Sequence, residues 1–318
     1  MKIVILDTIT FGEDMDLSPF QKLGEVEMYP TSTTKEAAER VKDADVIIVN
    51  KVLMNQETLA GASHVKLIAL TATGYNNVDL AYAKSRNIAV ANVSGYSTKS
   101  VVQHTFALAF YVLEKLSYYD TYVKSGEYCN SPCFTHFAEH FMELEGKTWG
   151  IIGLGTIGKE VAKVASAFGC HVIYYSTSGC NSNAEYEQVD LDTLLRESDV
   201  VSIHCPLNDA TFHLMDAAAF EKMKSHAVLV NVGRGPIVDE AALVEALNKN
   251  QIGGAALDVL SVEPMQKENP LLTVQDSRKL LITPHIAWAT TEARTRCLQE
   301  VYQNIESFFQ GKPRNIVG

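Results

Sequence analysis

Short apolar runs alternate with amphipathic stretches along most of the chain. In the first third, this pattern predicts buried strands at 2–6, 46–49, 65–70 and 88–93, with a helix at 33–43. Short apolar strands separated by helical stretches are typical of a parallel sheet that is covered on both faces. The first hundred or so residues therefore predict a small α/β domain of ordinary size.

A period of 3.6 residues replaces this alternation from Ser100 onward. Apolar positions recur through residues 101–116 and predict a long helix that leaves the first domain. The stretch that follows, residues 126–141, is aromatic and irregular. It is either a loop that packs on a partner subunit or an ordinary packed loop.

The alternation returns near residue 148 and predicts a second doubly wound sheet. Six strands are expected, at 148–152, 171–175, 200–204, 227–232, 255–259 and 280–283. Helices are expected at 157–168 and, capped by Asp239, up to residue 248. A last helical segment, 291–309, is too long for a loop and is expected to pack back across the first domain. The predicted fold class is α/β, with two doubly wound parallel-sheet domains of which the first is discontinuous.

The composition is that of an ordinary globular protein. The chain has 318 residues, too many for one ordinary core, and is 47% hydrophobic and 20% charged. It has no apolar stretch of 18 residues, and residues 2–7 are too short for a signal segment, so we expect a cytoplasmic protein without a membrane partner. A formal net charge of −11 without a basic run disfavours nucleic acid as a partner.

The cysteines give no metal-binding pattern. The six are scattered, and the pair Cys129 and Cys133 has no second pair at zinc-site spacing. We therefore expect no metal and free thiols in a reducing compartment. The six positions are Cys129, Cys133, Cys170, Cys180, Cys205 and Cys297.

A glycine-rich turn joins the strand expected at 148–152 to the helix that follows it. Gly153, Gly155 and Gly158 give the spacing G-x-G-x-x-G. Between a strand and a helix this spacing is typical of dinucleotide binding: the first glycine allows a tight turn, the second lets the backbone approach a pyrophosphate, and the third lets the helix pack closely. The helix N-terminus would then offer free N–H groups to the phosphates. The alternative is a glycine-rich turn with no ligand.

Three polar residues follow predicted strands of the second sheet: Arg234, Glu263 and His285. Ligands of doubly wound sheets bind at the carboxyl ends of the strands, so these side chains are expected at the edge where the glycine turn lies. Each has an ordinary alternative, namely a surface ion pair for Arg234, a solvated loop acid for Glu263 and a loop histidine for His285. Taken together, they favour an acid–base constellation.

Longer motifs give the chain a resemblance to one family, the D-isomer-specific 2-hydroxyacid dehydrogenases, over essentially its whole length. The matching signatures, in order and spacing, are Val232-Gly233-Arg234-Gly235, Asp258-Val259 with Glu263-Pro264, and Pro284-His285-Ile286. Residues 95–98, 103–108 and 285–289 resemble the glycerate dehydrogenase or hydroxypyruvate reductase branch in particular.

The resemblance implies an organisation and a reaction. Residues 100–287 would form a Rossmann dinucleotide-binding domain, inserted into a smaller flavodoxin-like substrate domain made of residues 1–99 and 288–318. The enzyme would transfer a hydride between NAD(P)H and a small 2-keto acid, of the hydroxypyruvate/glycerate or glyoxylate/glycolate type. The region between the two domains builds a two-fold interface in this family, so a homodimer is expected.

The resemblance also assigns the catalytic roles. Arg234 would bind the substrate carboxylate with its planar fork and polarise the ketone. His285 would donate a proton to the ketone oxygen, and Glu263 would hold the imidazole and favour its protonated form. Lys51 and the backbone of Thr73 and Gly74 would also bind the carboxylate.

The cofactor residues follow from the same resemblance, with Asp258 expected to bind the nicotinamide carboxamide. Besides the three glycines, the set comprises Thr156, Ile157, Ser176, Cys205, Pro206, Thr211, Val232, Gly233, Arg234 and Asp258.

Ser176 departs from the family pattern. NAD-specific members have an acidic residue here, at the end of the second strand, to bind the ribose hydroxyls. The serine would not repel a 2′-phosphate, and no Arg or Lys between Lys163 and Arg196 would attract one. The sequence therefore predicts NAD(H) or NADP(H), with NAD(H) slightly favoured.

The same fold also serves other functions. A dinucleotide-sensing protein of the corepressor type would keep the fold and the cofactor site without turnover. A phosphoglycerate dehydrogenase is disfavoured because the chain ends at Gly318 without an extra domain, and a formate dehydrogenase because a glutamine would be expected at Glu263.

Overall fold

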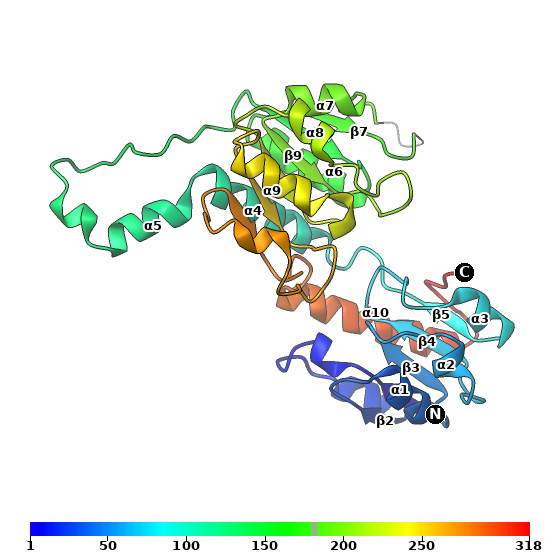
Figure 1. Cartoon of the computed structure of the whole chain (residues 1–318). Helices are drawn as coiled ribbons and strands as arrows, with labels where there is room; N and C mark the ends of the chain where they lie inside the picture. The colour runs from blue at the N-terminus through cyan, green and yellow to red at the C-terminus, as the bar shows by residue number, and fades with distance from the viewer. Residues whose placement is uncertain (180–182) are drawn as a thin grey trace. The chain divides into compact units, whose positions relative to one another are not determined.

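The computed structural model describes residues 1–179 and 183–318. The chain divides into two compact units (Figure 1). Unit 1 comprises Met1–Ser97 and Ala289–Gly318, and unit 2 comprises Thr98–Trp288. Unit 1 is thus discontinuous in sequence: one part of it precedes unit 2 along the chain and the other follows it.

Unit 1 contains a five-stranded parallel sheet in the order β2-β1-β3-β4-β5. This is the flavodoxin-like strand order, as expected. The two central strands read Val-Ile-Ile-Val and Leu-Ile-Ala-Leu and are buried at every position, because helices cover both faces. The strands are β1 (Lys2–Ile5), β2 (Glu25–Met28), β3 (Val46–Val49), β4 (Leu67–Leu70) and β5 (Ala89–Ala91).

Helix α10 (Thr291–Phe309), from the C-terminal part of the chain, belongs to unit 1. Its buried Asn304 donates to the carbonyl of Asn92, just beyond β5 (3.0 Å). Thr290 caps its N-terminus by accepting from the amide of Ala293. The other helices of the unit are α1 (Thr34–Arg40), α2 (Gln56–Leu59) and α3 (Leu80–Ser85), with 3-10 turns η1 (Thr8–Thr10) and η2 (Ser18–Lys22).

Unit 2 contains a seven-stranded parallel sheet in the order β12-β11-β10-β9-β6-β7-β8. Counted from β6, this is the Rossmann order with one added strand, and the direction of winding reverses between β6 and β9. The strands are β6 (Thr148–Ile152), β7 (His171–Tyr175), β8 (Glu187–Gln188), β9 (Val200–Ile203), β10 (Val228–Asn231), β11 (Gly254–Leu257) and β12 (Leu280–Ile282).

Each face of this sheet has its own apolar core. On one face, the fully buried Trp149 packs against Phe106, with ring centroids 4.7 Å apart, and its indole N–H donates to Ser202 (2.8 Å). On the other face, Phe220 packs among the aliphatic side chains of the strands. The helices are α4 (Thr98–Leu113), α5 (Leu116–Lys124), α6 (Thr156–Ala167), α7 (Leu191–Glu197), α8 (Ala217–Lys222) and α9 (Glu240–Asn248), with 3-10 turns η3 (Glu127–Asn130), η4 (Gly235–Ile237) and η5 (Pro270–Thr273).

The sequence-based element predictions missed some elements and misplaced one boundary. Strands β2 and β8 were not predicted, because β2 alternates Glu-Val-Glu-Met at an edge and β8 has only two exposed residues. The helix expected to reach Leu116 ends at Leu113 instead. There Lys115 takes a left-handed conformation (φ +54°) that separates α4 from α5.

The segment from α5 to Phe141, which we call the arm, extends away from the sheet of unit 2 (Figure 1). Helix α5 buries none of its residues. Aromatic side chains beyond it are strongly exposed, with 87% of Phe134 and 78% of Phe137 accessible. The arm therefore presents apolar surface that unit 2 itself does not cover.

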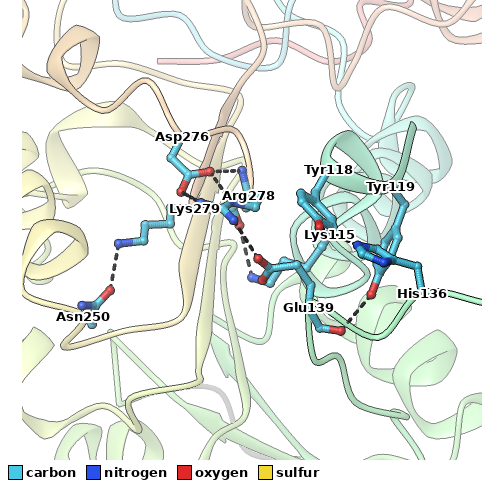
Figure 2. A network of polar contacts seen from close by, with 9 residues as sticks. All are labelled: Lys115, Tyr118, Tyr119, His136, Glu139, Asn250, Asp276, Arg278 and Lys279. Carbon is cyan, nitrogen blue, oxygen red and sulfur yellow. Dashed lines mark hydrogen bonds and ion pairs between the residues drawn. The ribbon is translucent and has the colours of Figure 1, made fainter. Parts of the chain in front are cut away.

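Arg278, just before β12, anchors the base of the arm (Figure 2). Its guanidinium binds Asp276 through two nitrogens, at 2.8 Å each, and donates to Glu139 of the arm (2.7 Å). It also lies 5.7 Å from the ring centroid of Tyr118 in α5. The hydroxyl of Tyr119 donates to the carbonyl of Glu139 (2.8 Å), so both chain segments of the arm are tied to the same point.

No helix in the described ranges is long and apolar enough to cross a membrane. The five described cysteines are free thiols, with Cys129 and Cys133 exposed and the other three buried. Cys180 lies outside the described residues.

Candidate active site

The glycine turn between β6 and α6 has three distinct environments. Gly153 has φ +96°, and a Cβ there would lie 2.7 Å from the Cys205 backbone. A Cβ on Gly158 would lie 2.3 Å from the carbonyl oxygen of Gly153, so the helix could not pack so closely with any other residue. A Cβ on Gly155 would meet nothing within 4 Å. The turn thus needs its first and third glycines for its own shape, while the second faces open space.

Helix α6 begins directly at this open space. Its N-cap is Gly155, which has no side chain to bind the amides of the first turn, where Thr156 and Ile157 lie. Unsatisfied first-turn N–H groups carry the positive end of the helix dipole and favour a bound anion. The turn and the helix start therefore fit the pyrophosphate of a dinucleotide.

Ser176 follows β7 at the same edge of the sheet. Only 7% of its surface is accessible, and its hydroxyl has no hydrogen-bond partner in the described part of the chain. An unpartnered buried hydroxyl is unfavourable unless something else binds it. This orphaned group fits the ribose hydroxyls of a dinucleotide whose phosphates lie at the glycine turn.

The loop after β9 contains Cys205, Pro206 and Thr211. Cys205 is buried with its backbone and Cβ against the Gly153 turn, and burial raises the pKa of its thiol to about 11. The hydroxyl of Thr211 is fully buried, donates to the carbonyl of Pro206 (2.8 Å) and accepts from the amide of Asn208 (2.8 Å). Thr211 therefore acts by shaping the loop.

Glu263 and His285 are in contact. Glu263, in the loop after β11, places its Oε2 atom 2.7 Å from Nδ1 of His285, in the loop after β12. A carboxylate only accepts hydrogen bonds, so Nδ1 donates and Nε2 is left for another partner. The second oxygen of Glu263 accepts from the amide of Leu260 (2.9 Å), which fixes the carboxylate. The pair is partly accessible, with 29% of the His285 side chain and 34% of the Glu263 side chain exposed.

Arg234 lies in the turn after β10. Asn231, fully buried, shapes this turn by accepting from the amide of Gly233 and donating to the carbonyl of Arg234, at 3.0 Å each. The guanidinium is exposed and donates to the carbonyl of Gly233 (2.9 Å). It forms no ion pair with any described residue, so most of its donors remain for a ligand.

The Arg234 turn and the Glu263 loop are packed backbone to backbone. A Cβ on Gly235 would lie 1.9 Å from the backbone of Leu260, so this approach requires glycine. Since β10, β11 and β12 are neighbours in the sheet, Arg234, Glu263 and His285 all follow its adjacent carboxyl ends. Val232 and Gly233, half-buried, lie on the same turn as Arg234.

The carboxylate of Asp258, at the end of β11, is almost fully buried and accepts hydrogen bonds from within unit 2. Burial raises its pKa, but bonds from His104, Thr283 and two backbone amides outweigh this and lower it. Asp258 is therefore an anion with most of its lone pairs in use. If Asp258 also bound a nicotinamide carboxamide, it would do so in addition to these hydrogen bonds within unit 2.

The other predicted substrate residues lie in unit 1. Lys51 follows β3 with an exposed side chain, and its amide donates to the buried carboxylate of Asp7 (2.7 Å). Thr73 and Gly74 follow β4, where Thr73 donates to the carbonyl of Val93 (2.8 Å). These residues share the carboxyl edge of the unit 1 sheet.

Two residues that hold loops at the carboxyl edges of the two sheets were not among the predicted site residues. Asn231 shapes the Arg234 turn, and Asp7 holds the Lys51 loop through backbone amides across 44 residues of chain. The available signal was position, since both lie at or just beyond the carboxyl end of a predicted strand. Among the described residues, no group of three His, Cys, Asp or Glu could hold a metal ion.

Comparison with known proteins gives consistent results. The family model described as D-isomer specific 2-hydroxyacid dehydrogenase, NAD binding domain, matches residues 106–287. The chain is 37% identical to a hydroxypyruvate reductase of Blautia hydrogenotrophica, covering 100% of this chain and 99% of the relative. It is also 37% identical to a glycerate dehydrogenase of Methylorubrum extorquens, covering 99% and 98%. The solved structure of an Aquifex aeolicus D-lactate dehydrogenase with NAD and lactic acid superposes with a TM-score of 0.85 at 28% identity, covering 98% of this chain and 96% of that one.

Proposed function

Since this chain belongs to the D-isomer-specific 2-hydroxyacid dehydrogenase family, we propose that Arg234, Glu263 and His285 form its catalytic set. The chain is an NAD(P)-dependent oxidoreductase that interconverts 2-keto acids and 2-hydroxy acids. The observation that carries the catalytic assignment is the 2.7 Å contact between Glu263 and Nδ1 of His285. It leaves Nε2 of the imidazole as the group that exchanges a proton.

The proposed substrates are hydroxypyruvate or glyoxylate in reduction, and glycerate or glycolate in oxidation. Two relatives support this choice by their names, the hydroxypyruvate reductase and the glycerate dehydrogenase. Lys51 and the backbone of Thr73 and Gly74 would bind the carboxylate together with Arg234. A guanidinium suits this task because its planar donors match a carboxylate.

The proton chemistry follows from the contacts of His285. When bound, the nicotinamide would supply the hydride for the keto carbon, or accept it in the reverse direction. In reduction, Nε2 of His285 would give its proton to the ketone oxygen, which becomes the hydroxyl. Glu263 would hold the imidazole through Nδ1 and prevent the ring from rotating. Arg234 would polarise the ketone while it holds the carboxylate.

NAD(H) or NADP(H) is the cofactor of this family fold. The Gly155 space and the start of α6 would hold its pyrophosphate, and Ser176 its ribose. The half-buried turn of Val232 and Gly233 and the loop of Pro206 would line the rest. Because Ser176 carries no charge, the site would discriminate weakly between the two dinucleotides.

A second copy of the chain is the proposed partner. The arm carries strongly exposed aromatic side chains and is anchored at its base, so it would be ordered before association. A two-fold dimer would bury this surface.

The proposed location is the cytoplasm. The free thiols of the described cysteines support a reducing, cytoplasmic setting.

The test is a panel of 2-keto acids assayed with NADH and with NADPH. The expected result is turnover of hydroxypyruvate or glyoxylate with both dinucleotides, faster than of longer 2-keto acids. A purified protein that binds dinucleotide yet reduces no 2-keto acid would overturn the proposal in favour of a sensor without turnover.

A further inference from the structure

His285 has a backbone conformation that rarely occurs in residues other than glycine. Its φ is +55°, in the left-handed region. Its amide donates to the carbonyls of Asp258 (2.8 Å) and Thr283 (3.0 Å). A strained residue keeps such a conformation only where its surroundings fix the chain on both sides. Specific contacts must therefore fix the loop 283–287.

One carboxylate fixes the loop on both sides of His285. Asp258 is 1% exposed and accepts from the amides of Ile286 (2.9 Å) and Ala287 (2.8 Å), which follow the histidine. It also accepts from the hydroxyl of Thr283, which precedes it (2.6 Å). The conformation at His285 thus depends on where the Asp258 carboxylate lies.

Helix α4 contacts this arrangement at both ends. Ser100 and His104 are one helical turn apart and so lie on the same face. The buried hydroxyl of Ser100 donates to the carbonyl of Ala287 (2.5 Å). His104 places Nε2 3.1 Å from the hydroxyl oxygen of Thr283 and 3.4 Å from Oδ1 of Asp258.

The proton on His104 follows from these contacts. The single hydroxyl proton of Thr283 is used toward Asp258, so the Thr283 oxygen can only accept from His104. The Asp258 carboxylate also only accepts. Nε2 of His104 therefore carries a proton and donates toward both. An amide N–H could take the same place, whereas an aliphatic side chain could not.

We propose that Ser100 and His104 of α4 are positioning residues for His285, acting through Ala287 and through Thr283 and Asp258. Within the described part of the chain, neither side chain forms a hydrogen bond with the imidazole of His285. Their effect is on the geometry of the loop that carries it. The proposal rests on the proposed catalytic role of His285.

The test compares His104→Leu, His104→Gln and Ser100→Ala by steady-state kinetics of 2-keto acid reduction, with dinucleotide binding used to count functional sites. We expect His104→Leu to lower kcat about 10- to 100-fold, because a displaced proton donor acts only in the transition state. The KM for the dinucleotide should change less than about twofold. His104→Gln, which retains a donor, should recover kcat to within about fivefold of wild type.

Thr105→Val is the matched control on the same helix. Its fully buried hydroxyl donates to the carbonyl of Val101 (2.8 Å) and makes no bond to the loop 283–287. Both Thr105→Val and Ser100→Ala remove one buried hydroxyl, so both should lower Tm. Only Ser100→Ala should lower kcat, by about 3- to 10-fold. If His104→Leu does not fold, this pair still decides the question.

Two results would overturn the inference. The first is a wild-type kcat in His104→Leu. The second is a loss of kcat in His104→Leu that His104→Gln does not restore and that Thr105→Val reproduces. The proposed function is tested separately by His285→Ala. If that variant is inactive while the Ser100 and His104 variants match wild type, only the positioning role fails.

Discussion

We expect the preference between NADH and NADPH to depend on Ser176. We predict that Ser176→Asp raises the ratio of kcat/KM for NADH over NADPH by about tenfold or more, because a carboxylate repels a 2′-phosphate and binds the ribose hydroxyls. The measurement is kcat/KM with each cofactor at a fixed concentration of keto acid. An unchanged ratio would show that Ser176 does not contact this part of the cofactor.

Ser176→Ala is the control for this change. It removes the hydroxyl that has no partner among the described residues and adds no charge. It should weaken both cofactors by similar factors and leave the ratio near the wild-type value.

The sequence identifies the proposed catalytic residues better than the residues that hold them in place. Arg234, Glu263 and His285 stand out because charged and titratable residues follow predicted strands at the ligand-binding edge. Asn231 and His104 do not, because their roles depend on which distant backbone or hydroxyl groups they reach. Asp258 illustrates the limit: its position is predictable, whereas its bonds to the amides of the His285 loop are not.

Among the elements, the arm differs most from its sequence pattern. The apolar stripe of α4 is readable because the helix packs on the sheet. Helix α5 was not predicted, because it buries no residue and so has no stripe that faces a core. The irregular aromatic stretch beyond it was recognised, but its exposure is a property of the folded unit.

The arm carries the prediction about assembly. We expect wild type to have about twice the chain mass of 35.0 kDa in light scattering at micromolar concentration. Phe134→Asp combined with Phe137→Asp should shift the protein toward the monomer, since charged groups would have to be buried in the interface. Phe309→Asp replaces an exposed aromatic residue of unit 1 and should leave the mass unchanged. A wild-type monomer under these conditions, or a double variant as dimeric as wild type, would contradict the assignment.

Considered as a whole molecule, the fold follows from its interior strands. Central strands such as β3, β4, β9 and β10 are buried at every position, so continuous apolar runs reveal them. The edge strand β2 is at most half-buried and β8 is exposed, so neither has a continuous apolar run. The alternation of strands and helices, with right-handed crossovers, then predicts a doubly wound sheet in each unit, without the places of β2 and β8.

Asp199 makes the stability of unit 2 sensitive to acid. Burial raises the pKa of this carboxyl, but bonds from His226, Lys224 and the amide of Thr148 outweigh burial, and the net pKa is lowered. A carboxyl whose pKa is lower in the folded than in the unfolded state stabilises the fold at pH values above its unfolded pKa. This stabilisation is lost as the pH falls through the folded pKa. We predict that the free energy of unfolding falls between about pH 5 and pH 2, and that Asp199→Asn flattens this dependence and costs about 1–3 kcal/mol at neutral pH.

Tryptophan fluorescence can follow this unfolding, because both tryptophans, Trp149 and Trp288, belong to unit 2. Asp209→Asn, at an exposed position of the same unit, is the matched control and should leave the pH dependence unchanged. A wild-type curve that is flat over the acid range would rule out the stabilising role of Asp199.

In the proposed reaction, His285, held by Glu263, exchanges the proton of 2-keto acid reduction. The most direct measurement is kcat for hydroxypyruvate reduction by His285→Ala at saturating NADH, with the dinucleotide Kd measured on the same preparation. We predict a kcat lower by about 10²–10⁴-fold, because general acid catalysis is lost, and a Kd within about threefold of wild type. A variant that reduces hydroxypyruvate at the wild-type rate would contradict it.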